Sequence, residues 1–219
     1  MFKEALSWYR AISPNNTRIQ QLESIVDVIE DFPFESVCCI ETGASQNWDD
    51  GCVGAFFAKL CQFTKGEFHS VDIYESTIEK SRILYNELGI KVNHYTQDSV
   101  KFLEETNIVP NLVHLDSWDL DLKNPFPSAL HGWREFIAIE DKMPMGSILI
   151  VDDNFFKGTW VQWNYTDGRE SEQIDINYPV VGKGSNIWHF VESGKSNWVK
   201  LSEDTVGSNI KLVYQKVKV

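Results

Sequence analysis

The sequence predicts an α/β fold, with a mostly parallel sheet, helices on both faces and an antiparallel pair of strands at the C-terminal end. Between residues 36 and 153, five short apolar segments alternate with segments of helical periodicity. Beyond a helical pattern around residues 184–194, segments 198–201 and 210–217 are predicted as strands joined by a polar turn. The chain has 219 residues, which suits one domain with a full-sized core.

An N-terminal helical extension is predicted over residues 1–34, ahead of a domain spanning residues 35–219. Ser13 and Pro14 interrupt the helical pattern, and Pro33 ends it. Between these breaks the apolar residues recur at helical spacing, at Ile19, Leu22, Ile25, Val26 and Ile29.

The elements of the domain follow one another regularly. Continuous apolar runs predict buried strands at 36–40, 68–71, 90–95, 111–115 and 148–151. Helices are predicted at 54–64, 76–89, 99–106 and 128–142. This alternation implies parallel strands with right-handed crossovers. Segment 155–182 has no clear periodicity, so we expect a lid or an acceptor-binding insertion there.

The composition limits the partners and the compartment. The formal net charge is −12, and the lysines are scattered, with Lys211, Lys216 and Lys218 alternating with apolar residues as on a solvated strand face. A basic stripe that could bind nucleic acid is therefore not predicted. The sequence shows neither a signal peptide nor a membrane-spanning stretch, which favours a soluble cytoplasmic protein. Free thiols are expected at Cys38, Cys39, Cys52 and Cys61, and a homo-oligomer remains open.

Acidic residues mark the ends of the predicted parallel strands. The set comprises Glu41, Asp72, Asp98, Asp116 and the pair Asp152-Asp153. In an open α/β sheet the carboxyl ends of the strands line the crevice where ligands bind. A buried carboxylate needs a donor, a metal or water as a partner, so a full set at this edge points to a ligand site.

The first of these loops favours a cationic ligand over a dinucleotide. It contains Glu41 and Gly43 where a pyrophosphate-binding turn would have G-x-G-x-x-G. S-adenosylmethionine (SAM) carries a sulfonium and an ammonium, and Gly43 would let the backbone approach it closely. Asp72 is placed to accept both ribose hydroxyls, and Asp98 with Ser99 would lie beside the adenine.

The sequence resembles class I SAM-dependent methyltransferases over roughly residues 35–195, in the segments CCIETGASQNWDDGCVGAFFAKL, HSVDIY and YTQDSVKFL. More specifically, IETGASQNWDDG, LDSWDLDLKNPFPSALHGWREF, ILIVDDN and GKG resemble bacterial and phage methyltransferase-like proteins related to the catechol and macrocin O-methyltransferases. The resemblance implies a Rossmann-like fold with a seven-stranded sheet. It also implies that Glu41, Gly43 and Ser45 hold the methionine end of SAM, Asp72 the ribose, and Asp98 with Ser99 the adenine. The first loop departs from the family pattern, because it keeps one glycine and is lengthened by residues 46–50.

The same resemblance implies a Mg²⁺ site formed by Asp116, Asp153 and Asn154. Oxygen ligands suit this hard cation, which would lower the pKa of an acceptor hydroxyl. In the alternative, Asp116 borders the SAM pocket and Asp152-Asp153 make ordinary loop hydrogen bonds.

Two further features concern the acceptor. Catechol enzymes place a lysine base where this chain has Asp119, so Asp119 and His131 are the candidate catalytic residues. Gly182-Lys183-Gly184 is either an anion-binding loop or the first turn of a helix.

The expected function is therefore O-methylation of a small or sugar-like acceptor with SAM, with or without the aid of Mg²⁺. The alternative is a binding or scaffold protein that has lost catalysis on the same fold. A nicotinamide-dependent oxidoreductase is disfavoured, because Glu41 replaces the expected glycine-rich turn.

Overall fold

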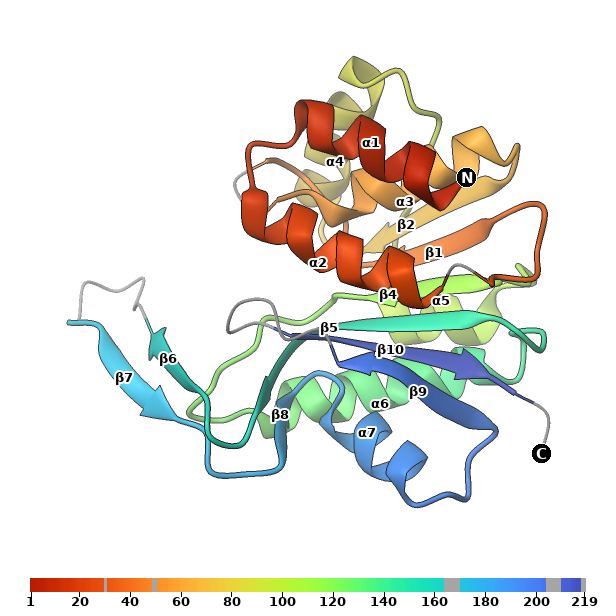
Figure 1. Cartoon of the computed structure of the whole chain (residues 1–219). Coiled ribbons are helices and arrows are strands. Elements are labelled where there is room, and N and C mark those ends of the chain that lie inside the picture. Colours follow the sequence, from red (N-terminus) through yellow and green to blue (C-terminus); the bar gives the residue numbers. More distant parts are fainter. Residues whose placement is uncertain (30, 49–50, 164–169, 204–209, 218–219) are drawn as a thin grey trace.

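The computed structural model describes residues 1–29, 31–48, 51–163, 170–203 and 210–217. A central sheet lies between two layers of helices, and its main path runs β3-β2-β1-β4-β5-β10-β9 (Figure 1). The strands of this path are β1 (Cys38–Thr42), β2 (Glu67–Asp72), β3 (Asn93–Thr96), β4 (Leu112–Leu115), β5 (Ile148–Phe156), β9 (Trp198–Glu203) and β10 (Ile210–Lys216). The first five pair in parallel, and β10 is antiparallel to both β5 and β9. The predicted parallel sheet and its C-terminal antiparallel pair are confirmed.

The direction of winding reverses between β1 and β4. From β1 the chain proceeds outward through β2 to β3, and it then returns to place β4 on the other side of β1. At such a switch point the loops leave neighbouring strands in opposite directions and open a crevice at the carboxyl ends of the strands. The predicted acidic residues of β1, β2 and β4 thus meet at one edge.

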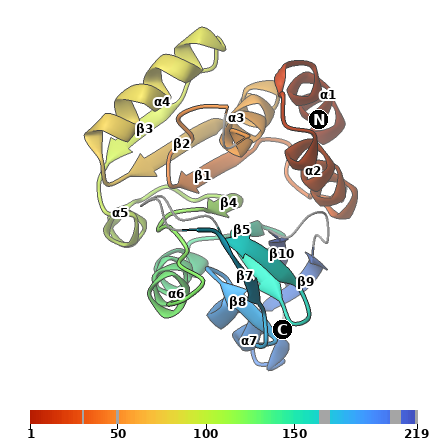
Figure 2. The ribbon, with the colours of Figure 1, turned by 90° about the vertical axis from the view of Figure 1, so that its left-hand side faces the viewer.

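The helices form one layer on each face of the sheet (Figure 2). On one face lie α1 (Phe2–Ile12), α2 (Asn16–Val28), α3 (Val53–Phe63) and α4 (Glu75–Glu87). On the other lie α5 (Ser99–Glu105), α6 (Phe126–Glu140) and α7 (Ser185–Glu192). Successive residues of a strand point to opposite faces, so Cys39 packs in the first core and Ile40 in the second. Burial on both faces explains the continuous apolar runs.

The first two helices are part of the main hydrophobic core. Tyr9 and Leu22 lie in the same cluster as Phe56 of α3 and Val213 of β10. The Tyr9 and Phe56 rings make an edge-to-face contact at 6.4 Å, and the Tyr9 hydroxyl donates to the carbonyl oxygen of Gly51. The predicted extension over residues 1–34 therefore closes one face of the sheet next to the loop that follows β1.

The segment after β5 has more regular structure than the sequence indicates. Strand β5 continues to Phe156, and β6 (Trp160–Trp163), β7 (Glu172–Asp175) and β8 (Val180–Gly182) follow it. β6 and β7 form a hairpin, while β8 pairs antiparallel with β5 and adds an eighth strand to the sheet. These strands of three or four residues are too short to give a periodic signal.

A small hydrophobic cluster of Leu122, Phe155, Ile176 and Val181 lies at the base of the hairpin. Residues 164–169 of the expected insertion and 204–209 of the expected polar turn lie outside the described residues.

The four cysteines are free, as predicted. Within the described ranges, every helix is too short or too polar to cross a membrane.

Candidate functional site

A cavity of about 670 Å³ lies at the carboxyl ends of β1, β2, β4 and β5. Its volume is in the range of small-molecule sites. The structure brings together nine of the predicted site residues in its lining: Gly43, Ser45, Asp72, Asp98, Ser99, Asp116, Asp119, His131 and Asp153. Two predicted site residues, Glu41 and Asn154, lie outside it. Cys52, Trp118 and Asp153 line it with positive φ angles, a backbone strain that often accompanies binding sites.

Gly43 allows the loop after β1 to pass directly over the end of β4. Its φ is +81°, and its amide donates to the carbonyl oxygen of Val71 at 2.9 Å. A Cβ at this position would lie 2.5 Å from the carbonyl oxygen of Asp116. Only glycine therefore fits between these two strand ends.

Glu41 supports this loop from behind. It is fully buried, and its carboxylate accepts hydrogen bonds of 2.9 Å from the hydroxyls of Ser45 and Ser70. Gly54, at the start of α3, provides the necessary space, because a Cβ there would lie 2.1 Å from Glu41 Oε1. Glu41 lies outside the cavity lining, and it positions Ser45, which does line the cavity.

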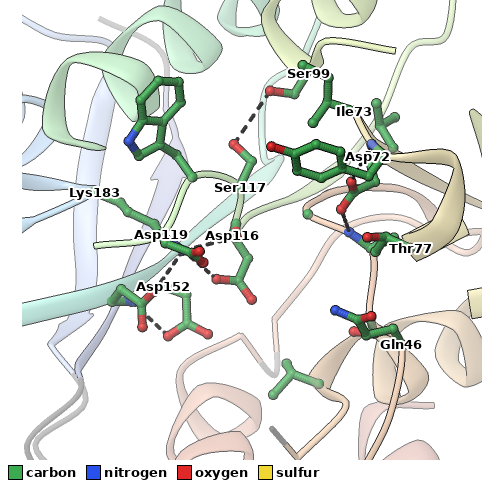
Figure 3. Close-up of a pocket in the computed structure, with 18 of the residues that line it drawn as sticks. Gln46, Asp72, Ile73, Thr77, Ser99, Asp116, Ser117, Asp119, Asp152 and Lys183 are labelled. Carbon is green, nitrogen blue, oxygen red and sulfur yellow. Dashed lines mark hydrogen bonds and ion pairs between the residues drawn. The ribbon is translucent and has the colours of Figure 1, made fainter. Parts of the chain in front are cut away.

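Asp72 lies at the end of β2 with its carboxylate in the cavity (Figure 3). It accepts from the amides of Ala44 at 3.2 Å and Tyr74 at 2.8 Å. A carboxylate offers about four lone-pair sites, so two amide donors leave capacity for two more. The same side of the cavity holds Asp98, which caps α5 by accepting from the Lys101 amide at 2.9 Å, and Ser99.

His131 of α6 forms the opposite wall. Its Nε2 lies 3.0 Å from the Ser99 hydroxyl and 3.5 Å from Glu135 Oε1, and its ring lies 5.0 Å from that of Trp118. Burial opposes ionisation of Glu135, yet contacts with His131 and Ser117 lower the pKa of its carboxyl below the ordinary value. An ionised Glu135 holds the imidazole in place. Asp119 lines the same cavity and is exposed.

Lys183 lies between two of the predicted acidic residues, Asp116 and Asp153. Figure 3 shows its side chain beside Asp116. Its ammonium is 2.7 Å from Asp116 Oδ1 and 2.7 Å from Asp153 Oδ2, and it donates to the Asp116 carbonyl oxygen at 3.0 Å. Burial favours the neutral amine, but the two carboxylates raise the pKa of Lys183 well above the ordinary value. The group is a permanent cation whose three N–H donors all have partners.

The flanking glycines place Lys183 at this point. At Gly182, φ is +132°, and a Cβ would lie 2.0 Å from the carbonyl oxygen of Asp153. The Gly184 amide donates to Asn154 Oδ1 at 2.7 Å, and α7 begins next. The Gly-Lys-Gly segment thus carries a lysine to carboxylates of the protein itself, and α7 begins directly after it.

The set Asp116, Asp153 and Asn154 does not fit a Mg²⁺ ion. Asn154 is fully buried, and its amide nitrogen donates to the carbonyls of Val151, Asp152 and Ile210. Its oxygen accepts from Gly184, so the side chain serves the backbone around β5. The Lys183 ammonium occupies the space between the two aspartates. The contacts of these three residues therefore do not support the Mg²⁺ site that the resemblance implies.

A second group of charges lies next to the cavity, and two of its members, Arg18 and Asp152, line it. His114 of β4 is fully buried, with its ring nitrogens 3.9 Å from Glu41 and 3.8 Å from Asp152. Lys211 contacts the Asp152 carboxylate, and Arg18 of α2 lies 3.7 Å from it. Burial disfavours the imidazolium, but Asp152 and Glu41 raise the pKa of His114 to about 9. The His114 and Arg18 distances are longer than hydrogen bonds, whereas Lys211 contacts Asp152 directly.

Lys211 corrects the expectation of a solvated strand face. Its exposed fraction is 0%, because β10 lies inside the sheet between β5 and β9. The local alternation of apolar and basic residues does not reveal this position. The sequence singles out Lys183 only as part of the Gly-Lys-Gly tripeptide, and His114 and Arg18 carry no local signal of a role at the site.

No protein-family model matches the sequence, and comparison with curated proteins gives no match. Solved structures do match across most of the chain. An S-adenosylmethionine-dependent methyltransferase of Clostridium acetobutylicum is 13% identical, with a TM-score of 0.56, and the match covers 95% of this chain and 94% of that one. SMU.1697c of Streptococcus mutans, in complex with SAH, is 11% identical, with a TM-score of 0.57 and coverage of 90% and 98%.

An rRNA methylase of Streptococcus thermophilus also matches, with 9% identity, a TM-score of 0.56 and coverage of 90% of this chain and 97% of that one. At such identities the likeness shows the fold and leaves the acceptor open. Together with the order and direction of the strands, it shows that the chain has the Rossmann-like fold of SAM-dependent methyltransferases.

Proposed function

We propose that the protein is a methyltransferase that binds SAM in the 670 Å³ cavity and methylates an oxygen of a small or sugar-like acceptor. One observation carries the proposal: the Asp72 carboxylate lies in the cavity beside the loop that Gly43 brings over the end of β4. This arrangement offers acceptors for two ribose hydroxyls and close backbone contact for the methionine part. The acidic lining suits a cofactor with a sulfonium and an ammonium.

The cofactor would extend along the cavity from β1 toward α5. Gly43 and Ser45 would contact the methionine end, Asp72 the ribose, and Asp98 with Ser99 the adenine. Asp116 would border the methionine end from β4. Glu41 would act through Ser45, because it lies behind the loop.

The chemistry is an in-line displacement. The acceptor oxygen attacks the methyl carbon, the carbon–sulfur bond breaks, S-adenosylhomocysteine (SAH) leaves as a neutral thioether, and the acceptor proton passes to a base. His131 is one candidate base, and its ring is held beside the cavity by Ser99 and Glu135. Asp119 is the second candidate, as an exposed carboxylate in the same lining. Positioning of the two reactants would supply most of the rate enhancement.

A small acceptor fits the charge of the molecule better than a nucleic acid does. The net charge of −12 would repel a phosphate backbone, and a positively charged stripe is what such a substrate requires. The rRNA methylases among the structural matches keep RNA as an alternative to be tested with the acceptor screen.

The direct test is calorimetric titration with SAH. We expect saturable binding, weakened at least about tenfold by Asp72→Ala, which corresponds to about 1.4 kcal/mol for the lost ribose contacts. Glu87→Ala is the matched control, because Glu87 is an exposed carboxylate at the far end of α4. If the unaltered protein binds neither SAH nor SAM, the chain is the catalytically degenerate binding protein of the second hypothesis.

The β6–β7 hairpin is our candidate for a lid over the acceptor. It follows β5, whose residues Asp152 and Asp153 line the cavity. The Ile176 amide donates to the Thr159 carbonyl at 3.0 Å, so the two ends of the hairpin are close. A variant in which two glycines replace residues 160–175 should therefore fold. We expect it to keep the SAH affinity of the unaltered protein while its turnover falls by about 100-fold.

The hairpin experiment requires an acceptor, which a screen of phenols, catechols, sugars and RNA with detection of SAH release would supply. A melting temperature close to that of the unaltered protein is the control for folding. Retained turnover, or a loss of SAH affinity in the folded variant, would contradict the role of the hairpin as a lid.

A further inference from the structure

The carboxyl ends of β4 and β5 are linked by a lysine rather than by a metal. We propose that the Lys183 ammonium takes the place of a divalent cation between Asp116 and Asp153, so that this part of the site is complete without a metal. The proposal concerns the chain's own charges and does not depend on methyl transfer.

The geometry around the ammonium carries the proposal. Three oxygens converge on Nζ, at 2.7, 2.7 and 3.0 Å, and they come from two strands that are neighbours in the sheet. The side chain is only 4% exposed. A divalent ion that used the same carboxylates would have to lie within a few ångströms of this buried cation, where the repulsion is strong.

The adjacent ligand-type groups are also engaged. Ligand atoms of His114, Asp116 and Asp152 lie within 4.8 Å of one another, as in a metal cluster. The Asp152 carboxylate, however, contacts Lys211 and faces Arg18 at 3.7 Å. Each carboxylate of this possible second site thus already has a cationic side chain beside it.

Lys183 acts as a positioning residue. Its three N–H donors are used by Asp116 and Asp153, so none remains for an acceptor, and its charge excludes a role as a base. It fixes the backbone of Asp116, whose carbonyl oxygen limits the space above Gly43. By holding Asp116 in place, the ammonium therefore stabilises the contact between the end of β4 and the loop after β1.

Binding of Mn²⁺, followed by electron paramagnetic resonance in the absence of cofactor and acceptor, tests the proposal. We expect the unaltered protein to show only the weak binding of its acidic surface. Lys183→Met should create a site at least about tenfold tighter than this background, because two carboxylates lose their counter-ion. Lys157→Met is the matched control, since Lys157 is an exposed lysine after β5. Lys183→Arg should behave like the unaltered protein.

Asp116→Asn in the Lys183→Met background should remove the new site. The proposal is overturned if the unaltered protein binds Mn²⁺ tightly and Asp116→Asn abolishes that binding, or if folded Lys183→Met gains no site. Where Lys183→Met unfolds in metal-free buffer, millimolar MnCl₂ should restore its folding. A variant that stays unfolded with and without the cation would also contradict the substitution of one charge for the other.

Discussion

Replacing Lys211 with methionine is expected to lower the free energy of unfolding by about 3–5 kcal/mol, which is the usual cost of removing one partner of a buried ion pair. Lys211 is fully buried, and its ammonium contacts Asp152, whose carboxylate is 1% exposed. Burial opposes ionisation of Asp152, but Lys211, His114 and Arg18 hold the pKa of its carboxyl well below the ordinary value. Removal of the lysine would leave this buried charge with weaker partners at 3.7 and 3.8 Å.

Urea unfolding at neutral pH measures this effect, and a double variant separates its causes. Lys211→Met with Asp152→Asn removes both charges, so we expect it to recover at least half of the lost stability. Lys200→Met is a control on the neighbouring strand, because Lys200 pairs with the partly exposed Glu192 and should change stability by less than about 1 kcal/mol. Equal losses in the Lys211 and Lys200 variants would show that the buried pair has no special role.

The parallel part of the fold could be predicted because its signals are local. A strand buried on both faces requires a continuous apolar run, and such runs identified β1, β2, β4 and β5. The edge strand β3 (Asn93–Thr96) is only partly buried, and the apolar run at 90–95 placed its start three residues too early and its end one residue too early. The hairpin and β8 were missed because their pairing depends on contacts with β5 and with each other.

The acidic residues of the candidate site could be predicted from the sequence, whereas its cationic residues could not. Acids at strand ends lie at one edge whatever the details of the fold, so Asp72, Asp98 and Asp116 were found from their positions alone. The cations come from distant elements: Lys183 from the turn before α7, Lys211 from β10 and Arg18 from α2. Their distances to the acids depend on the order of the strands, which a local pattern does not contain.

The lysine between the two aspartates was unpredictable for the same reason. Asp116 directly follows β4, as predicted, but Asp153 lies inside β5, which continues to Phe156. Lys183 is 30 residues or more away from both in the sequence and joins them through the pairing of β8 with β5. The resemblance supplied the acidic residues and could not supply the counter-ion. The signal in the sequence for this counter-ion is a lysine between two glycines, Gly182 and Gly184, in a chain with acids at the predicted strand ends.

Gly43→Ala is expected to lower both the stability and the affinity for SAH, and to do so through two separate effects. A residue with a side chain at a φ of +81° costs about 1–2 kcal/mol. In addition, the new methyl group would lie 2.5 Å from the Asp116 carbonyl oxygen, and relief of this overlap should cost a further 1–3 kcal/mol, roughly. The strand ends of β1 and β4 would move apart, and the loop that carries Ser45 would shift with them.

Gly89→Ala isolates the first effect, because Gly89 has a φ of +66° and its Cβ would meet nothing within 4 Å. We expect Gly89→Ala to lose about 1 kcal/mol and to leave SAH binding unchanged. Gly43→Ala should lose more in urea unfolding, and its affinity should fall by at least about tenfold in calorimetry. If the two variants lose equal stability and both bind SAH normally, the close approach of Gly43 to Asp116 does not shape the site. A larger loss of stability together with a loss of SAH affinity, seen at Gly43 and not at Gly89, would support control of cofactor binding by the distance between these two strand ends.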